Sequence, residues 1–250
     1  KSRSRGLGDV YKRQVYAIAM QVNGKLKEFS INIMKAINPK IVKAESNGQR
    51  SEMLNLSMQA SRFSLLLYSV IALPIYFEAK FILSLWLGEY PQEAVPFVKL
   101  FLILSLVNLT TIGLQTAIQA IGDVKAYQST IGSVLLLTIP FAYAVLTLGY
   151  PAYSVIVVSI VMEVVSCLMR FGFLRKKAGL SIERYVFFVL TKALQVITPT
   201  CVVLFVFTSS YEPSYLRVIS SGFISFGMIV GLTYWLVLST EEKNLIRLKV

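Results

Sequence analysis

The chain has no histidine and only two cysteines, Cys167 and Cys201, which both lie inside apolar runs. This inventory excludes a disulfide framework, a Cys/His metal cluster and the Ser/His or Cys/His arrangements of nucleophilic catalysis. A glycine-rich phosphate-binding loop followed by Lys-Ser or Lys-Thr is also missing. We therefore expect no metal, no cofactor and no enzymatic activity.

The composition is that of a membrane protein. Hydrophobic residues make up 55% of the 250 positions, and the mean hydropathy of +0.64 is high for a soluble domain. The net charge is +12, but the basic residues flank apolar runs. Basic residues in such positions meet anionic lipid headgroups, so we expect membrane lipids as partners and no nucleic acid.

Apolar windows of about 20 residues, the length that a helix needs to cross ~30 Å of hydrocarbon, recur along the chain. Seven are found: Val15–Ile37, Phe63–Leu87, Val95–Ile121, Ser129–Leu148, Tyr153–Leu174, Tyr185–Phe207 and Leu216–Leu238. Every backbone amide in lipid must bond within its own segment, so all seven are expected to be helices. The predicted fold is an all-α polytopic transmembrane bundle over residues 15–240. Pro74, Pro140 and Pro199 are expected to bend the spans that contain them.

The basic residues are concentrated in every second connection. The segments Lys35–Arg62 and Arg170–Arg184 carry five each, and the tail of residues 241–250 adds three more. The intervening connections, Gly88–Val95, Leu148–Tyr153 and Thr208–Tyr215, carry none. Short cytoplasmic loops are enriched in Lys and Arg, so this alternation predicts a cytoplasmic C-terminus.

Residues 1–14 do not fit that topology. They carry five basic residues, which would lie on the face that the charge pattern disfavours. Either this segment is a foreign leader, or it belongs after a further helix. We favour a truncated chain that carries an unrelated, non-native leader.

The first span carries a polar stripe. The polar residues recur at intervals of 4, 3, 4 and 3 and so share one helical face: Gln21, Lys25, Glu28, Asn32 and Lys35. Charge at membrane depth is costly and normally faces a bundle interior or a wet cavity, so the stripe favours a cavity-lining helix. The alternative is an amphipathic helix on the membrane surface, with Lys25 and Glu28 as an exposed pair. Asn23, Lys27 and Ser30 lie off the stripe.

Two later spans also contain polar residues. The third span has a milder stripe, consisting of Asn108, Thr111, Gln115 and Gln119, which would either hold helices together or line the same cavity. Glu163 lies near the middle of the fifth span, where a carboxylate must be paired or protonated. Lys192 is one candidate partner. Glu163 has either a functional role or none, because a carboxylate in mid-membrane can also be held neutral without one.

Several stretches together resemble a known family. AMQVNGKLKEFSINIMKAINPKIVKAESNG, MQASRFS, FILSLWLGEYP, QAIGDVKAYQ and LRKKAGLSIERY are similar, in order and spacing, to the C-terminal half of Wzx-type O-antigen or polysaccharide flippases. These transporters belong to the multidrug/oligosaccharidyl-lipid/polysaccharide exporter superfamily. The resemblance runs from about Val15 to the end of the chain.

The resemblance implies one lobe of a two-lobed exporter in the bacterial inner membrane. Its substrate would be an undecaprenyl-pyrophosphate-linked oligosaccharide, which moves from the cytoplasmic to the periplasmic leaflet during polysaccharide or lipopolysaccharide biosynthesis. The missing N-terminal half would be its partner, and Lys25 would lie on the helix that lines the cavity. The expected substrate-binding residues are Gln21, Lys25, Glu28, Asn32, Lys35, Asn108 and Gln115. Glu163 would be the candidate for coupling transport to an ion gradient. The alternatives are a multidrug or cation exporter of the same superfamily and a membrane-embedded glycosyltransferase or ligase.

Overall fold

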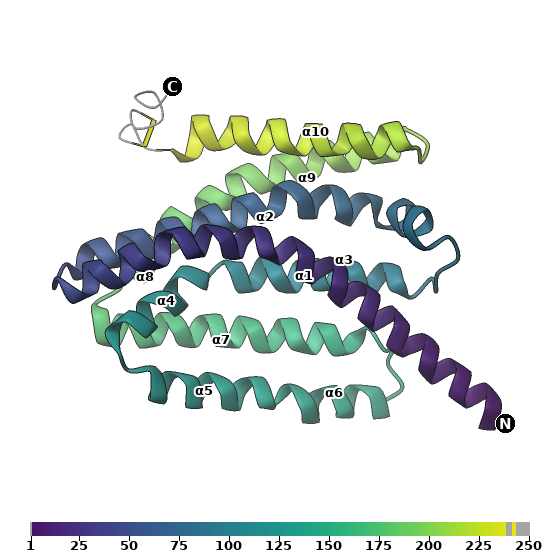
Figure 1. Cartoon of the computed structure of the whole chain (residues 1–250), viewed down its shortest axis with the longest axis horizontal. Coiled ribbons are helices and arrows are strands. Elements are labelled where there is room, and N and C mark those ends of the chain that lie inside the picture. The colour runs from purple at the N-terminus through teal and green to yellow at the C-terminus, as the bar shows by residue number, and fades with distance from the viewer. Residues whose placement is uncertain (1, 239–241, 244–250) are drawn as a thin grey trace.

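The computed structural model describes residues 2–238 and 242–243 (Figure 1). This part of the chain is helical and contains no strand, which confirms the all-α class. Two segments, η1 and η2, are π-helical. The elements are α1 (Ser2–Ser46), α2 (Arg50–Leu87), α3 (Ala94–Leu109), α4 (Ile112–Ile121), α5 (Val124–Leu136), α6 (Thr138–Thr147), α7 (Ser154–Ala178), α8 (Ile182–Tyr185), η1 (Val186–Thr191), α9 (Lys192–Ser210), α10 (Tyr215–Leu232) and η2 (Thr233–Val237).

Five helical stretches are long and apolar enough to cross a membrane. They are Arg50–Leu87, Val124–Thr147, Ser154–Ala178, Ile182–Ser210 and Tyr215–Val237. The pair α3 and α4 makes a sixth if its 42° bend is accepted within one span. The chain is therefore built as a membrane protein. The expected first span lies within α1, which is helical but is not among these apolar stretches.

α1 is longer than the sequence indicated. It begins at Ser2, so that the backbone of residues 2–14, interpreted as a leader, continues the same helix. Of the predicted tail, residues 241–250, only residues 242–243 are described, and the remainder lies outside the described residues.

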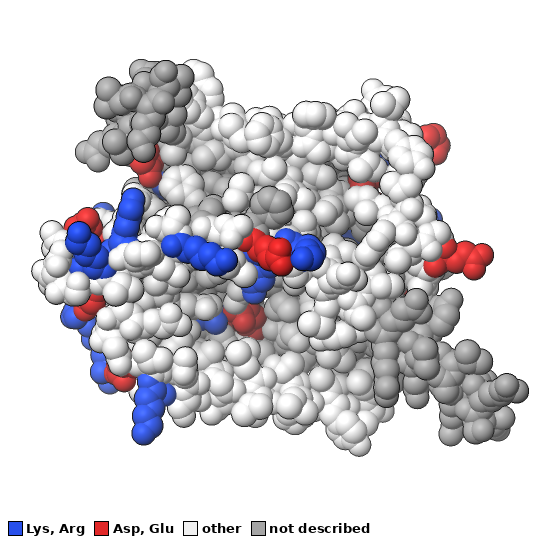
Figure 2. All heavy atoms as spheres, viewed as in Figure 1, with Lys and Arg blue, Asp and Glu red and all other residues white. Residues whose placement is uncertain are grey.

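The helices lie side by side, so that the connections gather at two ends (Figure 1). We call the end that holds the α1–α2, α4–α5 and α7–α8 connections the basic end. Two contacts join these connections: Lys177 Nζ lies 2.7 Å from Asp123 Oδ2, and Arg50 Nη1 donates to the carbonyl of Lys177 at 3.2 Å. The three basic-poor connections lie at the opposite end. The grouping of connections that the charge pattern predicts is therefore confirmed, and Figure 2 shows Lys and Arg gathered at the basic end.

The prolines act differently from one span to another. α2 and α9 continue through Pro74 and Pro199. The span that contains Pro140 is divided at Leu137 into α5 and α6. Proline has no amide to donate to the carbonyl four residues earlier, and residue 136 is the last residue of α5.

The buried apolar residues form two clusters that meet inside the bundle. Along α7, Ile156 belongs to the first cluster and Phe171 to the second. Likewise, Leu109 before the α3–α4 break belongs to the first cluster, and Leu114 after the break belongs to the second. α6, by contrast, has no buried residue, as expected of a helix that faces lipid. The residues between the two clusters are polar, and they form the candidate site.

Candidate functional site: a buried charged network at a helix break

The predicted third span is not one continuous helix. It breaks between Leu109 and Ile112, although it contains no proline there. Side-chain hydroxyls donate hydrogen bonds to backbone carbonyls at the break. The hydroxyl of Thr110 donates to the carbonyl of Val107 at 2.6 Å, and the hydroxyl of Tyr185, from α8, donates to the carbonyl of Thr110. Hydrogen bonds of this kind satisfy the groups that a broken helix leaves open.

A close contact between helices holds the far side of the break. The amide of Gly113 donates to Ser61 Oγ of α2 at 2.9 Å. A Cβ atom at position 113 would lie only 2.0 Å from the carbonyl oxygen of Ser57. Only a glycine lets the start of α4 approach the backbone of α2 this closely.

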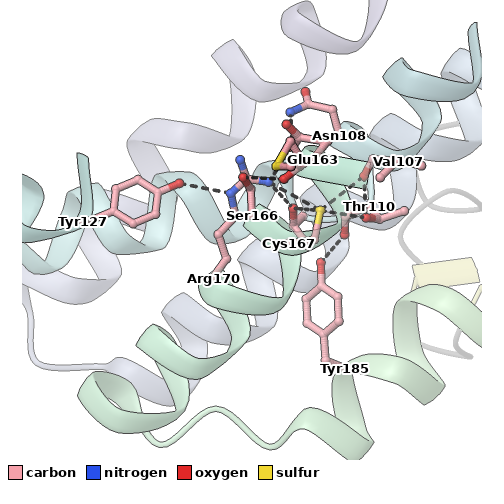
Figure 3. A network of polar contacts seen from close by, with 11 residues as sticks. Val107, Asn108, Thr110, Tyr127, Glu163, Ser166, Cys167, Arg170 and Tyr185 are labelled. Carbon is pink, nitrogen blue, oxygen red and sulfur yellow. Dashed lines mark hydrogen bonds and ion pairs between the residues drawn. The ribbon is translucent and has the colours of Figure 1, made fainter. Parts of the chain in front are cut away.

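A charge pair lies beside this break (Figure 3). Arg170 Nη1 is 2.8 Å from Glu163 Oε1, and the two residues are only 3% and 7% exposed. They lie seven residues apart on α7, which is two helical turns, and therefore share one face. Asn108 Nδ2 donates to the same carboxylate oxygen at 2.8 Å.

The remaining donors of Arg170 join α7 to two other elements. Arg170 Nη1 also donates to Thr111 Oγ1 at 2.8 Å, and Arg170 Nε donates to the hydroxyl of Tyr127 of α5 at 3.1 Å. Cys167 Sγ lies 3.2 Å from the same Thr111 hydroxyl. A buried ion pair persists only where such hydrogen bonds compensate for its desolvation. The network is therefore a closed unit that spans α5, the α3–α4 break and α7.

The network contains two of the predicted site residues, but the partner predicted for Glu163 is wrong. Asn108 and Glu163, predicted as site residues on different spans, are hydrogen-bonded to each other. Lys192 is not the partner of Glu163, because its ammonium donates to the carbonyls of Leu236 and Val237 at 3.2 and 3.3 Å. Arg170 was assigned to a basic connection. Its spacing of seven residues from Glu163 was the signal that the pair shares one helical face.

The polar stripe of α1 lies on the outside of the bundle, and Figure 2 shows charged side chains in a row along this face. The opposite face of α1 buries Ile18, Leu26, Met34 and Ile41. The only ion pair within the stripe, among the described residues, is Lys25 with Glu28 at 3.4 Å, and its two side chains are 74% and 63% exposed. All five stripe residues are exposed: Gln21, Lys25, Glu28, Asn32 and Lys35.

The polar residues off the stripe point inward. Asn23 Oδ1 accepts hydrogen bonds from Tyr68 at 3.0 Å and from Ser105 at 2.7 Å. Lys27 is half-buried and interacts electrostatically with both Glu163 and Arg170. Lys27 is therefore part of the surroundings of the buried network. The side chain of Ser30 lies outside the described residues.

The other predicted residues lie apart from the network. Gln115 is half-buried on α4, beyond the break, and Gln119 is exposed. Among the described hydrogen bonds, none joins Gln115 or any stripe residue to the Glu163–Arg170 pair. The predicted site residues thus form two groups, the buried network and the exposed stripe.

Among the described residues, the sequence analysis missed two further ion pairs in which one partner is fully buried. Arg217 Nη2 lies 2.6 Å from Glu78 Oε2 and joins α10 to α2. Arg62 Nη2 lies 2.8 Å from Glu242 Oε1 and joins α2 to the C-terminal segment. The partners in each pair are separated by more than a hundred residues, so no local spacing could reveal them.

No family model, no curated protein and no solved structure matches the chain. What the chain does is therefore inferred from its own residues.

The charges that surround α1 are mainly positive. Inside the bundle, Lys27 and Arg170 face the single acid Glu163. On the stripe, Lys25 and Lys35 accompany the single acid Glu28. A surface with two basic groups for each acid attracts an anion better than a cation. Glu163, the candidate ion-coupling residue, is bound to Arg170.

Proposed function

We propose that the chain is the C-terminal lobe of a transporter that moves undecaprenyl-pyrophosphate-linked oligosaccharides from the cytoplasmic to the periplasmic leaflet. The exposed polar stripe of α1 is the observation that carries this proposal. A polar face on a bundle of apolar helices needs water or a polar partner. In a two-lobed exporter it would line the central cavity and face the N-terminal half, and the lobes would rock to expose the cavity to either side in turn. The resemblance of the sequence to Wzx-type flippases agrees with this assignment.

The direction of α1 favours the cavity over the surface-helix alternative. An interfacial helix lies in the plane of the membrane, across the ends of the spanning helices. α1 instead runs along α2 on one side of the bundle (Figure 1), and Leu26 and Met34 on its buried face belong to the two apolar clusters. The polar stripe thus follows the depth of the bundle and not one of its ends.

The charge of the stripe supports an anionic substrate. Lys25 would attract the pyrophosphate, and Glu28 would be its partner in the resting state. A multidrug or cation exporter would be expected to carry an excess of acid on the same face. A membrane-embedded glycosyltransferase or ligase would need a sizeable loop with acid/base residues. The connections at the opposite end, residues 88–93, 148–153 and 211–214, are short.

The proposed location is the bacterial inner membrane, with the basic end and the C-terminus in the cytoplasm. This orientation follows the positive-inside rule applied to the connections that the structure groups at one end. The lipid tail of the substrate would remain in the bilayer while its sugars and pyrophosphate cross along the stripe.

The test measures binding by the purified chain in lipid nanodiscs, with undecaprenyl pyrophosphate and uncharged undecaprenol as probes. We expect a preference for the pyrophosphate. Lys25→Ala should weaken pyrophosphate binding about tenfold, the effect of losing one charge-assisted hydrogen bond. Lys25→Arg should retain most of the affinity because the charge remains. Lys40→Ala is the matched control, since Lys40 is exposed on the same helix but off the stripe.

Four results would contradict the proposal. One is equal binding of the two probes, and another is an unchanged affinity of Lys25→Ala for the pyrophosphate. The third is tighter binding of a cationic dye than of pyrophosphate, which would favour the drug exporter. Release of a glycosylated product from a lipid-linked sugar donor would favour the enzyme.

A further inference from the structure

A second charged cluster lies on α2, away from the network at the helix break. Arg62 is 1% exposed, and its guanidinium lies over the rings of Phe63 at 4.9 Å and Phe188 at 5.3 Å. Its Nη2 binds Glu242. Within residues 2–238 and 242–243, its buried Nε and Nη1 find no acceptor. Leaving donors of a charged group unsatisfied is costly, so the site is built for more acceptor oxygens than Glu242 supplies.

Both π-helical segments meet at this cluster. Phe188 belongs to η1, and Lys192, directly after η1, donates to the carbonyls of Leu236 and Val237 at the end of η2. The ammonium of Lys192 also lies 5.8 Å from the centre of the Phe188 ring. Single π-helical turns occur frequently at functional sites. Here they bring a second cation to the same aromatic ring as Arg62.

An apolar groove begins beside Glu242. It has a volume of about 740 Å³ and runs between α2 and α10. Its polar lining is confined to a few residues, among them Glu242 and Gln59. The apolar lining comes from both helices: Phe63, Leu66, Leu67, Val70, Ile229 and Val230. This volume lies within the ~300–1,000 Å³ range of ligand sites in proteins.

The length of the groove fits one leaflet of a bilayer. Its lining on α2 extends from Gln59 to Val70, which at 1.5 Å per residue is roughly 16 Å. Half of a hydrocarbon core of ~30 Å is about 15 Å. The acyl chain of a phospholipid therefore matches the groove, with its headgroup at the end where Arg62 and Glu242 lie.

We propose that this groove binds an anionic phospholipid of the leaflet at the basic end, and that Glu242 competes with its phosphate for Arg62. A carboxylate and a phosphodiester are both oxygen acceptors for the guanidinium fork, so the Glu242 carboxylate occupies the position of a phosphate oxygen. The phosphate brings further oxygens for the free Nε and Nη1 donors. Glu242 and the lipid phosphate are thus alternative partners of Arg62.

The chain contains a suitable reporter of this site. Trp235 lies in η2, beside the groove residues Thr233 and Tyr234, and the only other tryptophan, Trp86, can be replaced in a Trp86→Phe background. The full chain is reconstituted in phosphatidylcholine vesicles that contain a small fraction of lipid with dibrominated acyl chains. The brominated lipid is either phosphatidylglycerol or phosphatidylcholine, and quenching of Trp235 fluorescence is measured for each.

The expected result is stronger quenching by the anionic lipid, with a relative affinity about fivefold higher than that of phosphatidylcholine. Glu242→Gln should raise this preference, because the competitor is removed. Arg62→Gln should reduce the ratio to near one. The matched controls are Glu52→Gln on α2 and Arg175→Gln on α7, which change the charge equally at exposed positions of the basic end and should leave the ratio unchanged.

Several outcomes overturn the proposal. Equal quenching by the two lipids in both the parent and Glu242→Gln would show an ordinary lipid-facing groove. An unchanged ratio in Glu242→Gln would show that Glu242 does not compete with the lipid for Arg62. If Arg62→Gln and Arg175→Gln lowered the affinity ratio equally, the anionic lipid would be attracted by the net charge of the protein alone. If Arg62→Gln loses its helical circular dichroism, the Glu242→Gln comparison decides the question by itself.

Discussion

Glu163 and Arg170 bind each other across two turns of the same helix, with Arg170 Nη1 2.8 Å from Glu163 Oε1. Both partners lie on α7, so the buried charge of each residue is neutralised by a residue of the same helix. The neighbours Asn108, Thr111 and Tyr127 then use the pair to fasten α7 to the α3–α4 break and to α5. The pair therefore links α7 to both the break and α5.

Removing one member of this pair is expected to be more harmful than removing both. Arg170→Met leaves the carboxylate of Glu163 buried without its cation, and breaking a buried pair in this way costs about 3–5 kcal/mol. The double variant Glu163→Gln/Arg170→Gln keeps polar groups at both positions and should lose less. Thermal unfolding in detergent, followed by circular dichroism, measures both. A double variant less stable than Arg170→Met would contradict this account.

Gly113 should tolerate no side chain. Gly113→Ala places a Cβ within 2.0 Å of the Ser57 carbonyl oxygen, so that α4 must move away from α2 and the hydrogen bond to Ser61 is lost. Overpacking of this kind costs about 1–3 kcal/mol. The control is Gly132→Ala in α5, where nothing lies within 4 Å of the added atom. Gly132→Ala should be neutral or stabilising by about 0.5–1 kcal/mol. Equal melting temperatures for the two variants would show that α4 and α2 can separate enough to accept a Cβ atom at position 113.

Arg217 is expected to hold the turn between α9 and α10. Its Nη1 donates to the carbonyl of Thr208 at 3.0 Å and to that of Tyr211, and its Nη2 binds Glu78 of α2. Arg217→Gln should therefore increase hydrogen exchange of the amides in residues 208–215, measured by mass spectrometry. Lys80→Gln, an exposed basic residue near the same end, is the control and should leave this exchange unchanged. Unaltered exchange in Arg217→Gln would show that the turn is held by other contacts.

The two ends of the bundle should differ in access from outside the cell. In a Cys167→Ser/Cys201→Ser background, Gln92→Cys is expected to react with an impermeant maleimide added to intact cells. Lys176→Cys should react only after the cells are opened. Both positions are exposed, so burial does not decide the result. Labelling of Lys176→Cys in intact cells would reverse the orientation and remove a premise of the proposed transport direction.

The parts of the structure that follow from local chemistry were predictable. Hydropathy indicates the helices, and the charges near Arg50 and Lys177 indicate which connections share an end. The intervals of three and four residues along α1 predict its polar face. Asn108 and Glu163 were identified because polar groups are rare in apolar spans.

The unpredicted parts depend on partners distant in the chain. The break after Leu109 is held by Ser61 and Tyr185, which lie on other helices. Arg217 was not assigned a role because Glu78, its partner, is 139 residues away. The interval between such partners carries no periodic signal, and only the packed bundle brings them together.

The contact between Gly113 and Ser57 has a consequence for the recognition of homologues. Any sequence that keeps this crossing of α4 and α2 must keep a residue without Cβ at position 113, whatever else diverges. The hydrogen bond from its amide adds a small hydroxyl residue at position 61. A glycine just after the helix break, together with a small hydroxyl residue on the helix equivalent to α2, is therefore a fingerprint. Distant members of this lineage are expected to share it even where overall identity has been lost.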